Sequence, residues 1–148
     1  YIMEEENLTS KSVLDIFNHK SGMYGVSGIS SDARDIIDAA KNGNEQAQLT
    51  LNMYTNRVSE TIGSYFIKLE KVDAIVFTGG IGENAGIIRD DIFRKIQVAM
   101  NIDVDRDLNM EIVGEETKIS LDSSKSEVWI VPTNEELVIA RDTYAFIQ

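Results

Sequence analysis

The hydrophobic and polar positions of the chain alternate between helical and extended patterns. The longest predicted helix runs from Asn44 to about Lys71, because apolar residues recur there in steps of three and four. This stripe comprises Ala47, Leu51, Tyr54, Val58, Ile62, Tyr65 and Leu69. Core packing is the expected role of most of these residues, and a partner-facing surface, widened by Phe66, is the second role.

Three shorter helices are predicted from capping residues that precede apolar positions. The candidate N-caps are Thr9 or Ser10 for the first, Ser30 or Ser31 for the second, and Thr133 or Asn134 for the last. The apolar positions are Val13, Leu14 and Phe17 in the first helix, and Leu137, Ala140, Tyr144 and Ile147 on the inner face of the last. The second helix is expected from Asp32 to about Lys41, with Gly43 suited to cap its C-terminus.

Strands are predicted in three places. Ala74–Phe77 is a continuous apolar run, as expected of a strand that is buried on both faces. Thr117–Leu121 alternates between polar and apolar residues, and a further strand, Glu127–Val131, ends at Pro132. Residues 22–28, which contain three glycines, indicate a turn-rich segment or a short strand.

The first strand leads into a glycine turn, Thr78–Gly82, and then into a further helix that ends near Met100. The apolar positions of this helix are Ile88, Ile92, Phe93 and Ile96. A strand, a glycine turn and a helix N-terminus together can bind an anion or a nucleotide, because free N–H groups and the helix dipole point at the turn. The pattern does not match the G-x-G-x-x-G fingerprint of dinucleotide-binding proteins. It is also not a P-loop, because no lysine follows the glycines. A structural turn and a ligand-binding loop both remain open.

Composition excludes several classes of function. The chain has 148 residues, a net charge of −11 and no cysteine. The acidic balance disfavours nucleic acid and anionic membranes as partners. His19 is the only histidine, so a site built from several histidines is impossible within this chain. The aspartates of residues 101–109 lack the glycine and distal glutamate of an EF-hand loop, so a solvated loop is expected there.

Three segments carry a resemblance to one enzyme family. Phe77–Asn84 resembles the adenosine-binding loop of acetate kinases, Ser21–Asp35 resembles that family's glycine- and serine-rich segment, and Thr133–Asp142 resembles its C-terminal signature. The resemblance implies an α/β fold, a ribonuclease-H-like lobe of the acetate and sugar kinase, Hsp70 and actin superfamily. A mixed sheet with helices on both faces and the nucleotide loop after a central strand is expected. Because the match begins in mid-segment, residues 1–148 are expected to be the C-terminal nucleotide-binding lobe of a longer two-lobe kinase.

The resemblance also assigns roles to particular residues. Asp32, Ala33 and Arg34 would line the nucleoside pocket, where Asp32 could accept from ribose hydroxyls and Arg34 could lie along the base. Gly80, Ile81 and Asn84 would contact the nucleoside, while Gly79 and Gly82 would allow close backbone approach. Glu135 would be the catalytic acidic residue that helps to place Mg²⁺. From the residues alone Glu136 is equally eligible, because both fall in the first turn of a predicted helix.

The implied reaction is reversible transfer of the γ-phosphoryl group of ATP to acetate, which gives acetyl phosphate and ADP. The expected cofactors are ATP or ADP and Mg²⁺, the expected location is the cytoplasm, and the expected assembly is a homodimer formed through this lobe. Neither nucleic acid nor membrane is an expected partner. The alternatives are a propionate or butyrate kinase lobe and a non-catalytic nucleotide-binding or dimerisation module. Since the residues that hold acetate and the transferring phosphoryl group lie upstream in the family, the fragment alone is expected to be inactive.

Overall fold

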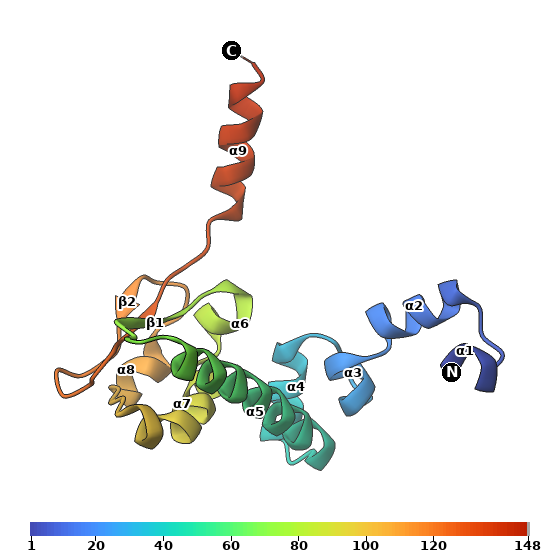
Figure 1. Ribbon diagram of the computed structural model, residues 1–148, viewed down its shortest axis with the longest axis horizontal. Coiled ribbons are helices and arrows are strands. Elements are labelled where there is room, and N and C mark those ends of the chain that lie inside the picture. The colour runs from blue at the N-terminus through green and yellow to red at the C-terminus, as the bar shows by residue number, and fades with distance from the viewer. Residues whose placement is uncertain (148) are drawn as a thin grey trace. The chain divides into compact units, whose positions relative to one another are not determined.

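The computed structural model describes residues 1–147, except for the side chain of Glu135. The chain divides into two compact units, Tyr1–Glu60 and Thr61–Gln148, each of which is described by itself. The elements of the first unit are α1 (Ile2–Glu5), α2 (Ser10–His19), α3 (Gly22–Ser27), α4 (Ala33–Lys41) and the beginning of α5 (Glu45–Lys68) (Figure 1).

Local hydrogen bonds explain where the short helices of the first unit begin and end. Thr9 caps α2 by accepting from the backbone N–H of Ser12 at 3.2 Å, as predicted. The turn or short strand expected at residues 22–28 is instead helix α3, which ends at Ser27 and is capped by Gly28 with a φ of +66°. The prediction was wrong because the backbone of this segment bonds within itself, as from the N–H of Gly28 to the carbonyl of Tyr24.

Helix α4 has a different N-cap from the predicted one. Asp32, and neither Ser30 nor Ser31, accepts from the N–H of Arg34. At the other end Gly43 has a φ of +85°, and its N–H bonds to the carbonyl of Ala40. This left-handed residue closes the helix in the predicted way, because glycine adopts positive φ without steric cost.

Helix α5 ends at Lys68, about three residues before the predicted boundary. The N-terminal part of its stripe is buried at Ala47 and Leu51, whereas Tyr65 and Leu69 are exposed. The prediction of a core stripe is therefore confirmed only for the first turns. Thr50, Thr55 and Ser59 are also buried, and each hydroxyl bonds to a backbone carbonyl of the preceding turn. Small polar residues can be buried in a helix when their hydroxyls are satisfied locally.

The second unit contains a mixed sheet of three strands in the order β1-β3-β2. The strands are β1 (Ala74–Phe77), β2 (Thr117–Lys118) and β3 (Glu127–Ile130). β3 runs parallel to β1, with Ala74 opposite Glu127, and antiparallel to β2. In the described chain β1 is thus an edge strand, and Val76 is 52% exposed. The predicted central position was wrong because β1 has a strand on one side only, and burial on both faces was wrong because Ala74 and Val76, which share one face, are exposed.

Helices α6 (Gly79–Asn84), α7 (Gly86–Met100) and α8 (Arg106–Glu111) follow β1 (Figure 1). The predicted apolar face of α7 is buried, and the rings of Phe77 and Phe93 meet edge to face with centroids 5.2 Å apart. Residues 101–109, predicted as a solvated loop, contain a β-bridge at Val104 and the start of α8. Asp105 caps α8 by accepting from the N–H of Leu108, so the aspartates serve local structure.

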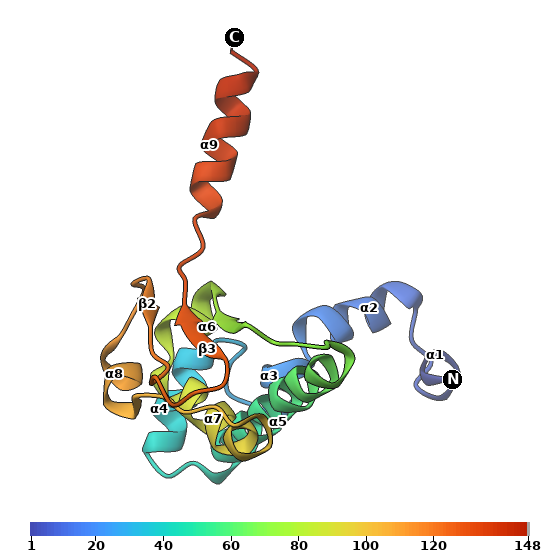
Figure 2. The same ribbon diagram turned by 60° about the vertical axis from the view of Figure 1, so that its left-hand side comes forward.

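The last helix, α9 (Glu135–Ala145), follows β3 through residues 131–134 (Figure 2). Asn134 caps it by accepting from the N–H of Leu137 at 2.9 Å, as predicted. The predicted inner face is exposed at Leu137, Tyr144 and Ile147. That prediction was wrong for this chain, because helical periodicity indicates which residues share a face and not whether another element covers it.

Candidate functional site

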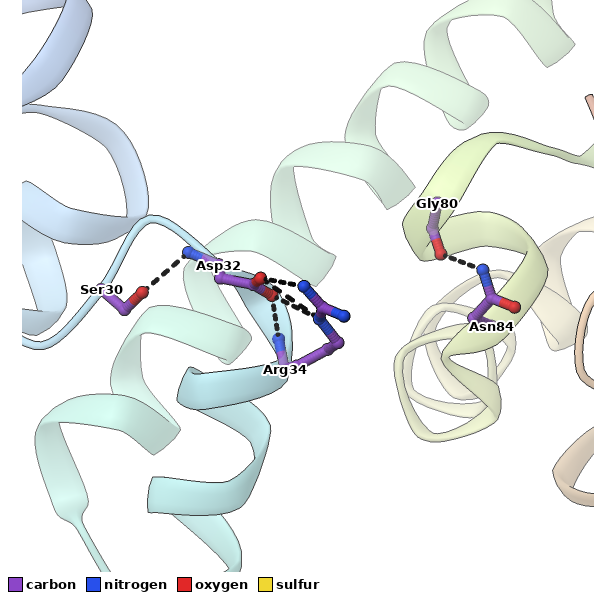
Figure 3. Close-up of polar contacts among 5 residues, drawn as sticks. All are labelled: Ser30, Asp32, Arg34, Gly80 and Asn84. Carbon is purple, nitrogen blue, oxygen red and sulfur yellow. Dashed lines mark hydrogen bonds and ion pairs between the residues drawn. The ribbon is translucent and has the colours of Figure 1, made fainter. Parts of the chain in front are cut away.

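The first group of candidate residues lies at the start of α4. The backbone N–H of Asp32 donates to the hydroxyl of Ser30 at 3.0 Å, and the Asp32 carboxylate accepts from the backbone of Arg34 at 2.9 Å. The guanidinium of Arg34 folds back onto the same carboxylate, with Nε–Oδ1 at 3.1 Å and Nη2–Oδ2 at 2.5 Å (Figure 3). Asp32 therefore caps the helix and orients Arg34 at the same time.

The charges and the solvent exposure of Asp32 and Arg34 make both side chains available to a polar ligand. The hydrogen bonds from Arg34 lower the pKa of Asp32 to about 2, so the carboxylate stays ionised in mildly acidic solution as well as at neutral pH. The side chain of Arg34 is 87% exposed and that of Asp32 is 39% exposed, which leaves both accessible. A carboxylate has about four acceptor positions, so Asp32 retains capacity for a hydroxyl. Ala33, between them, is buried.

The three glycines of the glycine turn differ in whether backbone conformation or close packing requires a glycine at that position. Gly79 has a φ of +72°, a backbone conformation that side chains rarely adopt. A Cβ on Gly82 would lie 3.3 Å from the backbone carbon of Phe77, tighter than ordinary packing. A Cβ on Gly80 would meet nothing within 4 Å. Conformation explains the first glycine and packing the second, whereas neither accounts for Gly80.

Asn84 is held at the opposite end of α6. Its side-chain amide donates to the carbonyl of Gly80 at 2.9 Å, one helical turn earlier (Figure 3). This bond fixes the amide beside the surface of Gly80 and leaves the side-chain oxygen of Asn84 as an acceptor. The expected glycine loop is therefore a short helix that places a small residue and an amide on one side.

Sequence reasoning missed Glu83, which joins two of the motifs. Its Oε1 accepts from the N–H of Gly79 at 2.7 Å and from the N–H and the hydroxyl of Thr133 at 2.6 and 2.8 Å. The bonds from Thr133, followed by those from Gly79 and Thr78, lower the pKa of Glu83 against the opposing effect of burial. The only sequence signal was a carboxylate next to the glycines, and a solvated glutamate has the same signal.

Arg89 was also missed. This residue is fully buried on α7 and donates to the side chain of Asn109 at 2.8 Å and to the carbonyl of Gly82 at 2.8 Å. Its other terminal nitrogen donates to the carbonyls of Asn109 and Ile112. The sequence signal was a single arginine beside the apolar face of a helix. Arg89 therefore stabilises the glycine turn, because the carbonyl of Gly82 that it binds belongs to that turn.

The proposed metal residue lies partly outside the description. Glu135 is the first residue of α9, but its side chain is outside the described part of the structure. Among the described residues, no three His, Cys, Asp or Glu side chains form a group that could hold a metal ion. The described helices also include none that is long and apolar enough to cross a membrane.

The structure thus brings some of the candidates together. In the second unit, Gly79 and Thr133 meet at one carboxylate oxygen, so the glycine turn and the Thr133–Asp142 segment begin side by side. Asp32, Ala33 and Arg34 form a separate group in the first unit.

Comparisons with known proteins agree on one family. The sequence model of the acetokinase family matches residues 1–141. The acetate kinase of Thermoanaerobacterium thermosaccharolyticum is 49% identical over 149 residues, which is 100% of this chain and 37% of that enzyme. The crystal structure of Porphyromonas gingivalis acetate kinase superimposes with a TM-score of 0.87 at 42% identity, covering 99% of this chain and 37% of that one. A propionate kinase from Francisella tularensis gives 0.84 at 34% identity, covering 96% and 35%. The chain therefore spans a little over a third of the relatives that it matches.

Proposed function

Since the chain belongs to the acetokinase family, whose fold is that of the acetate and sugar kinase, Hsp70 and actin superfamily, we propose that it forms the nucleotide-binding lobe of an acetate kinase. The reaction would transfer the γ-phosphoryl group of ATP to acetate and give acetyl phosphate and ADP, reversibly. Phosphoryl transfer depends mainly on positioning and charge neutralisation, which a binding lobe can supply in part.

The observation that carries the proposal is the open surface at Gly80. Apart from its chain neighbours and the backbone of its own helix, nothing in the described chain lies within 4 Å of the position that a Cβ would occupy there, and Gly80 does not have a positive φ. A glycine without a structural reason, at the start of a helix that follows a strand, suits the close approach of a ligand to the backbone. Ile81 and Asn84 would contact the nucleoside beside Gly80, with Gly79 and Gly82 holding the turn in shape.

Asp32 and Arg34 would provide the polar part of the nucleoside pocket. Arg34 orients the Asp32 carboxylate, which can accept hydrogen bonds from the ribose hydroxyls. The planar guanidinium of Arg34 can lie along the base. Ala33, which is buried in this structure, would line the nucleoside pocket from beneath these two side chains only with its small methyl group.

Glu135 is the proposed magnesium residue. Mg²⁺ is commonly held by one or two carboxylates together with substrate phosphates and water, and α9 begins with two acidic residues, Glu135 and Glu136, of which the family resemblance favours Glu135. When bound with the nucleotide, Mg²⁺ would neutralise charge on the transferring phosphoryl group. The part of this chain is to hold the nucleoside and to place Glu135.

Acetate is the first candidate acceptor because the named relatives include acetate kinases at up to 49% identity. Propionate is the second, because a propionate kinase matches the fold with a TM-score of 0.84. Butyrate kinase and a non-catalytic nucleotide-binding or dimerisation module remain less favoured. We further propose a cytoplasmic homodimer that acts on small molecules and contacts neither nucleic acid nor membrane, in keeping with a net charge of −11.

The test is a chimera in which this chain replaces the matching segment of the Thermoanaerobacterium enzyme. We expect acetyl phosphate formation from ATP and acetate, with lower rates on propionate and butyrate. We expect the 148-residue chain alone to be inactive. Losing one donor to a developing charge costs a factor of about 100 to 1,000. A folded but inactive chimera would contradict the proposal, and so would a wild-type-like rate from the chain alone.

Gly80→Val supplies a sharper test in the same chimera. The added side chain would occupy the proposed nucleoside surface, so the KM for ATP should rise by about tenfold or more. Gly63→Val is the matched control, because a Cβ on Gly63 in α5 also meets nothing within 4 Å. Equal KM values for the two variants would show that the surface at Gly80 does not bind the nucleotide.

A further inference from the structure

We propose that Glu83 is a positioning residue that holds Thr133, and with it the start of α9, on the glycine turn. The inference rests on the proposed function, in which the turn meets the nucleoside and the start of α9 places Glu135. We infer that the carboxylate of Glu83 fixes the position of the start of α9 relative to the glycine turn.

The geometry of the contact supports this role. A single oxygen, Oε1, accepts from Gly79 at 2.7 Å and from the N–H and hydroxyl of Thr133 at 2.6 and 2.8 Å. The donors come from segments about 50 positions apart in the chain. Hydrogen bonds to an ionised acceptor are roughly twice as strong as neutral ones, so this oxygen is a strong point of attachment. Glu83 is only 9% exposed, and water competes little for it.

The contact begins where the sheet ends. The backbone pairing of β1 and β3 continues as far as the N–H of Val131, which donates to the carbonyl of Phe77 at 2.9 Å. Two residues later the N–H of Thr133 donates to the side chain of Glu83. The carboxylate thus extends the attachment of the chain beyond the last backbone bond of the sheet.

Packing contributes little to holding the start of α9. Thr133, Asn134 and the described side chains of α9 are exposed, and among the described residues the side chain of Asn134 bonds only to the N–H of Leu137, in its own helix turn. Val131 and Pro132 are half-buried. In the described chain the bonds to Glu83 are therefore the principal constraint on Thr133. Loss of the carboxylate should free the start of α9 while leaving the β1–β3 pairing in place.

Amide hydrogen exchange of the 148-residue chain tests the attachment without any nucleotide. Glu83→Ala should lower the protection of both the Gly79 and the Thr133 amides by about tenfold, the factor that corresponds to one ordinary hydrogen bond. Protection of the Val131 amide should persist. The control is Glu127→Gln, because the Glu127 carboxylate bonds to Lys118 and Trp129 on the sheet and, among the described residues, forms no hydrogen bond to the turn. Unchanged protection at Thr133 in Glu83→Ala would overturn the inference.

Kinetics of the chimera test the consequence. Glu83→Ala should lower kcat by about 10- to 100-fold and raise the Mg²⁺ concentration for half-maximal activity, as with residues that orient a metal ligand. The kcat and the Mg²⁺ requirement of Glu83→Gln should lie between those of wild type and Glu83→Ala. Thr133→Ser should have wild-type values. Thr133→Val should also give intermediate values, and it replaces Glu83→Ala as the test if Glu83→Ala fails to fold. A purely structural role would reduce the folded fraction but leave kcat per folded molecule and the Mg²⁺ requirement unchanged, which would overturn the inference. An inactive wild-type chimera would instead count against the proposed function, and the exchange result would still decide the attachment.

Discussion

Arg89 and Asn109 bind each other through both side chain and backbone in the interior of the second unit. Nε of Arg89 donates to the side-chain oxygen of Asn109 at 2.8 Å, and Nη2 donates to its carbonyl at 2.6 Å. Both residues are 0% exposed. The Asn109 amide in turn donates to the carbonyl of Gly86 at 3.0 Å, so the pair ties the start of α7 to α8. A buried cation satisfied by an amide and by backbone carbonyls is intolerant of losing either partner.

Arg89→Met should lower the free energy of unfolding by about 3 kcal/mol, because two buried and two partly buried hydrogen bonds lose their donor while the side-chain volume is largely kept. Urea denaturation followed by circular dichroism measures this. Arg94→Met is the control: Arg94 is exposed and pairs with Asp90, so its loss should cost no more than about 1 kcal/mol. Similar midpoints for the two variants would contradict the assigned role of Arg89.

Gly86→Ala should destabilise the chain by about 1 to 3 kcal/mol through overpacking. Its Cβ would lie 2.7 Å from the carbonyl oxygen of Asn109 and 3.0 Å from the Cα of Met110, and neither backbone atom can move aside cheaply. Gly63→Ala in α5 has open space and should stabilise the chain by about 0.5 to 1 kcal/mol. Thermal melts of both variants measure these changes in stability. A change of the same sign in the two variants would contradict the prediction.

Gly79→Ala and Gly80→Ala should separate conformation from binding. Gly79 has a φ of +72°, so alanine there should cost about 1 to 2 kcal/mol of stability. Gly80→Ala should leave the unfolding free energy nearly unchanged, since its Cβ has room. Denaturation midpoints test both expectations. A large loss in Gly80→Ala would mean that the fold itself requires this glycine.

Asp32→Ala should cost about 1 kcal/mol, because α4 loses the side chain that accepts from Arg34 N–H. Asp32→Asn should keep most of that stability, since an asparagine oxygen caps equally well, while it removes the ion pair with Arg34. In the chimera both variants should raise the KM for ATP. If Asp32→Asn binds ATP as well as the wild type does, the proposed ribose contact by an ionised Asp32 is wrong.

The stability contributed by Glu83 should depend on pH. Its hydrogen bonds, those from Thr133 first, lower the pKa in the folded chain below the value of about 4.3 for an unfolded glutamate. The contribution is therefore complete above the unfolded pKa and is lost as the pH falls through the lower folded pKa. Denaturation at a series of pH values between neutrality and about pH 3 should show wild type losing more stability than Glu83→Gln. If the stability of wild type and of Glu83→Gln changed with pH in the same way, Glu83 would not be the group that carries this pH dependence.

Local signals predicted the elements whose structure depends on near neighbours. The apolar run Ala74–Phe77 is strand β1, and the apolar spacing after the glycines is helix α7. Gly43 and Asn134 cap helices as expected. The helices α3 (Gly22–Ser27) and α8 (Arg106–Glu111) were missed, because short helices in polar or glycine-rich sequence have weak periodicity.

The sequence by itself determined the family and the order of its three motifs, because these follow from residue type and spacing along the chain. Only the tertiary structure decided that β1 is an edge strand in this chain and that α9 is exposed. It also decided that Glu83 meets Thr133 and that Arg89 meets Asn109. These relationships join residues about 50 and 20 positions apart. Such contacts depend on how the elements pack in space, and the periodicity of a single element carries no information about its partners.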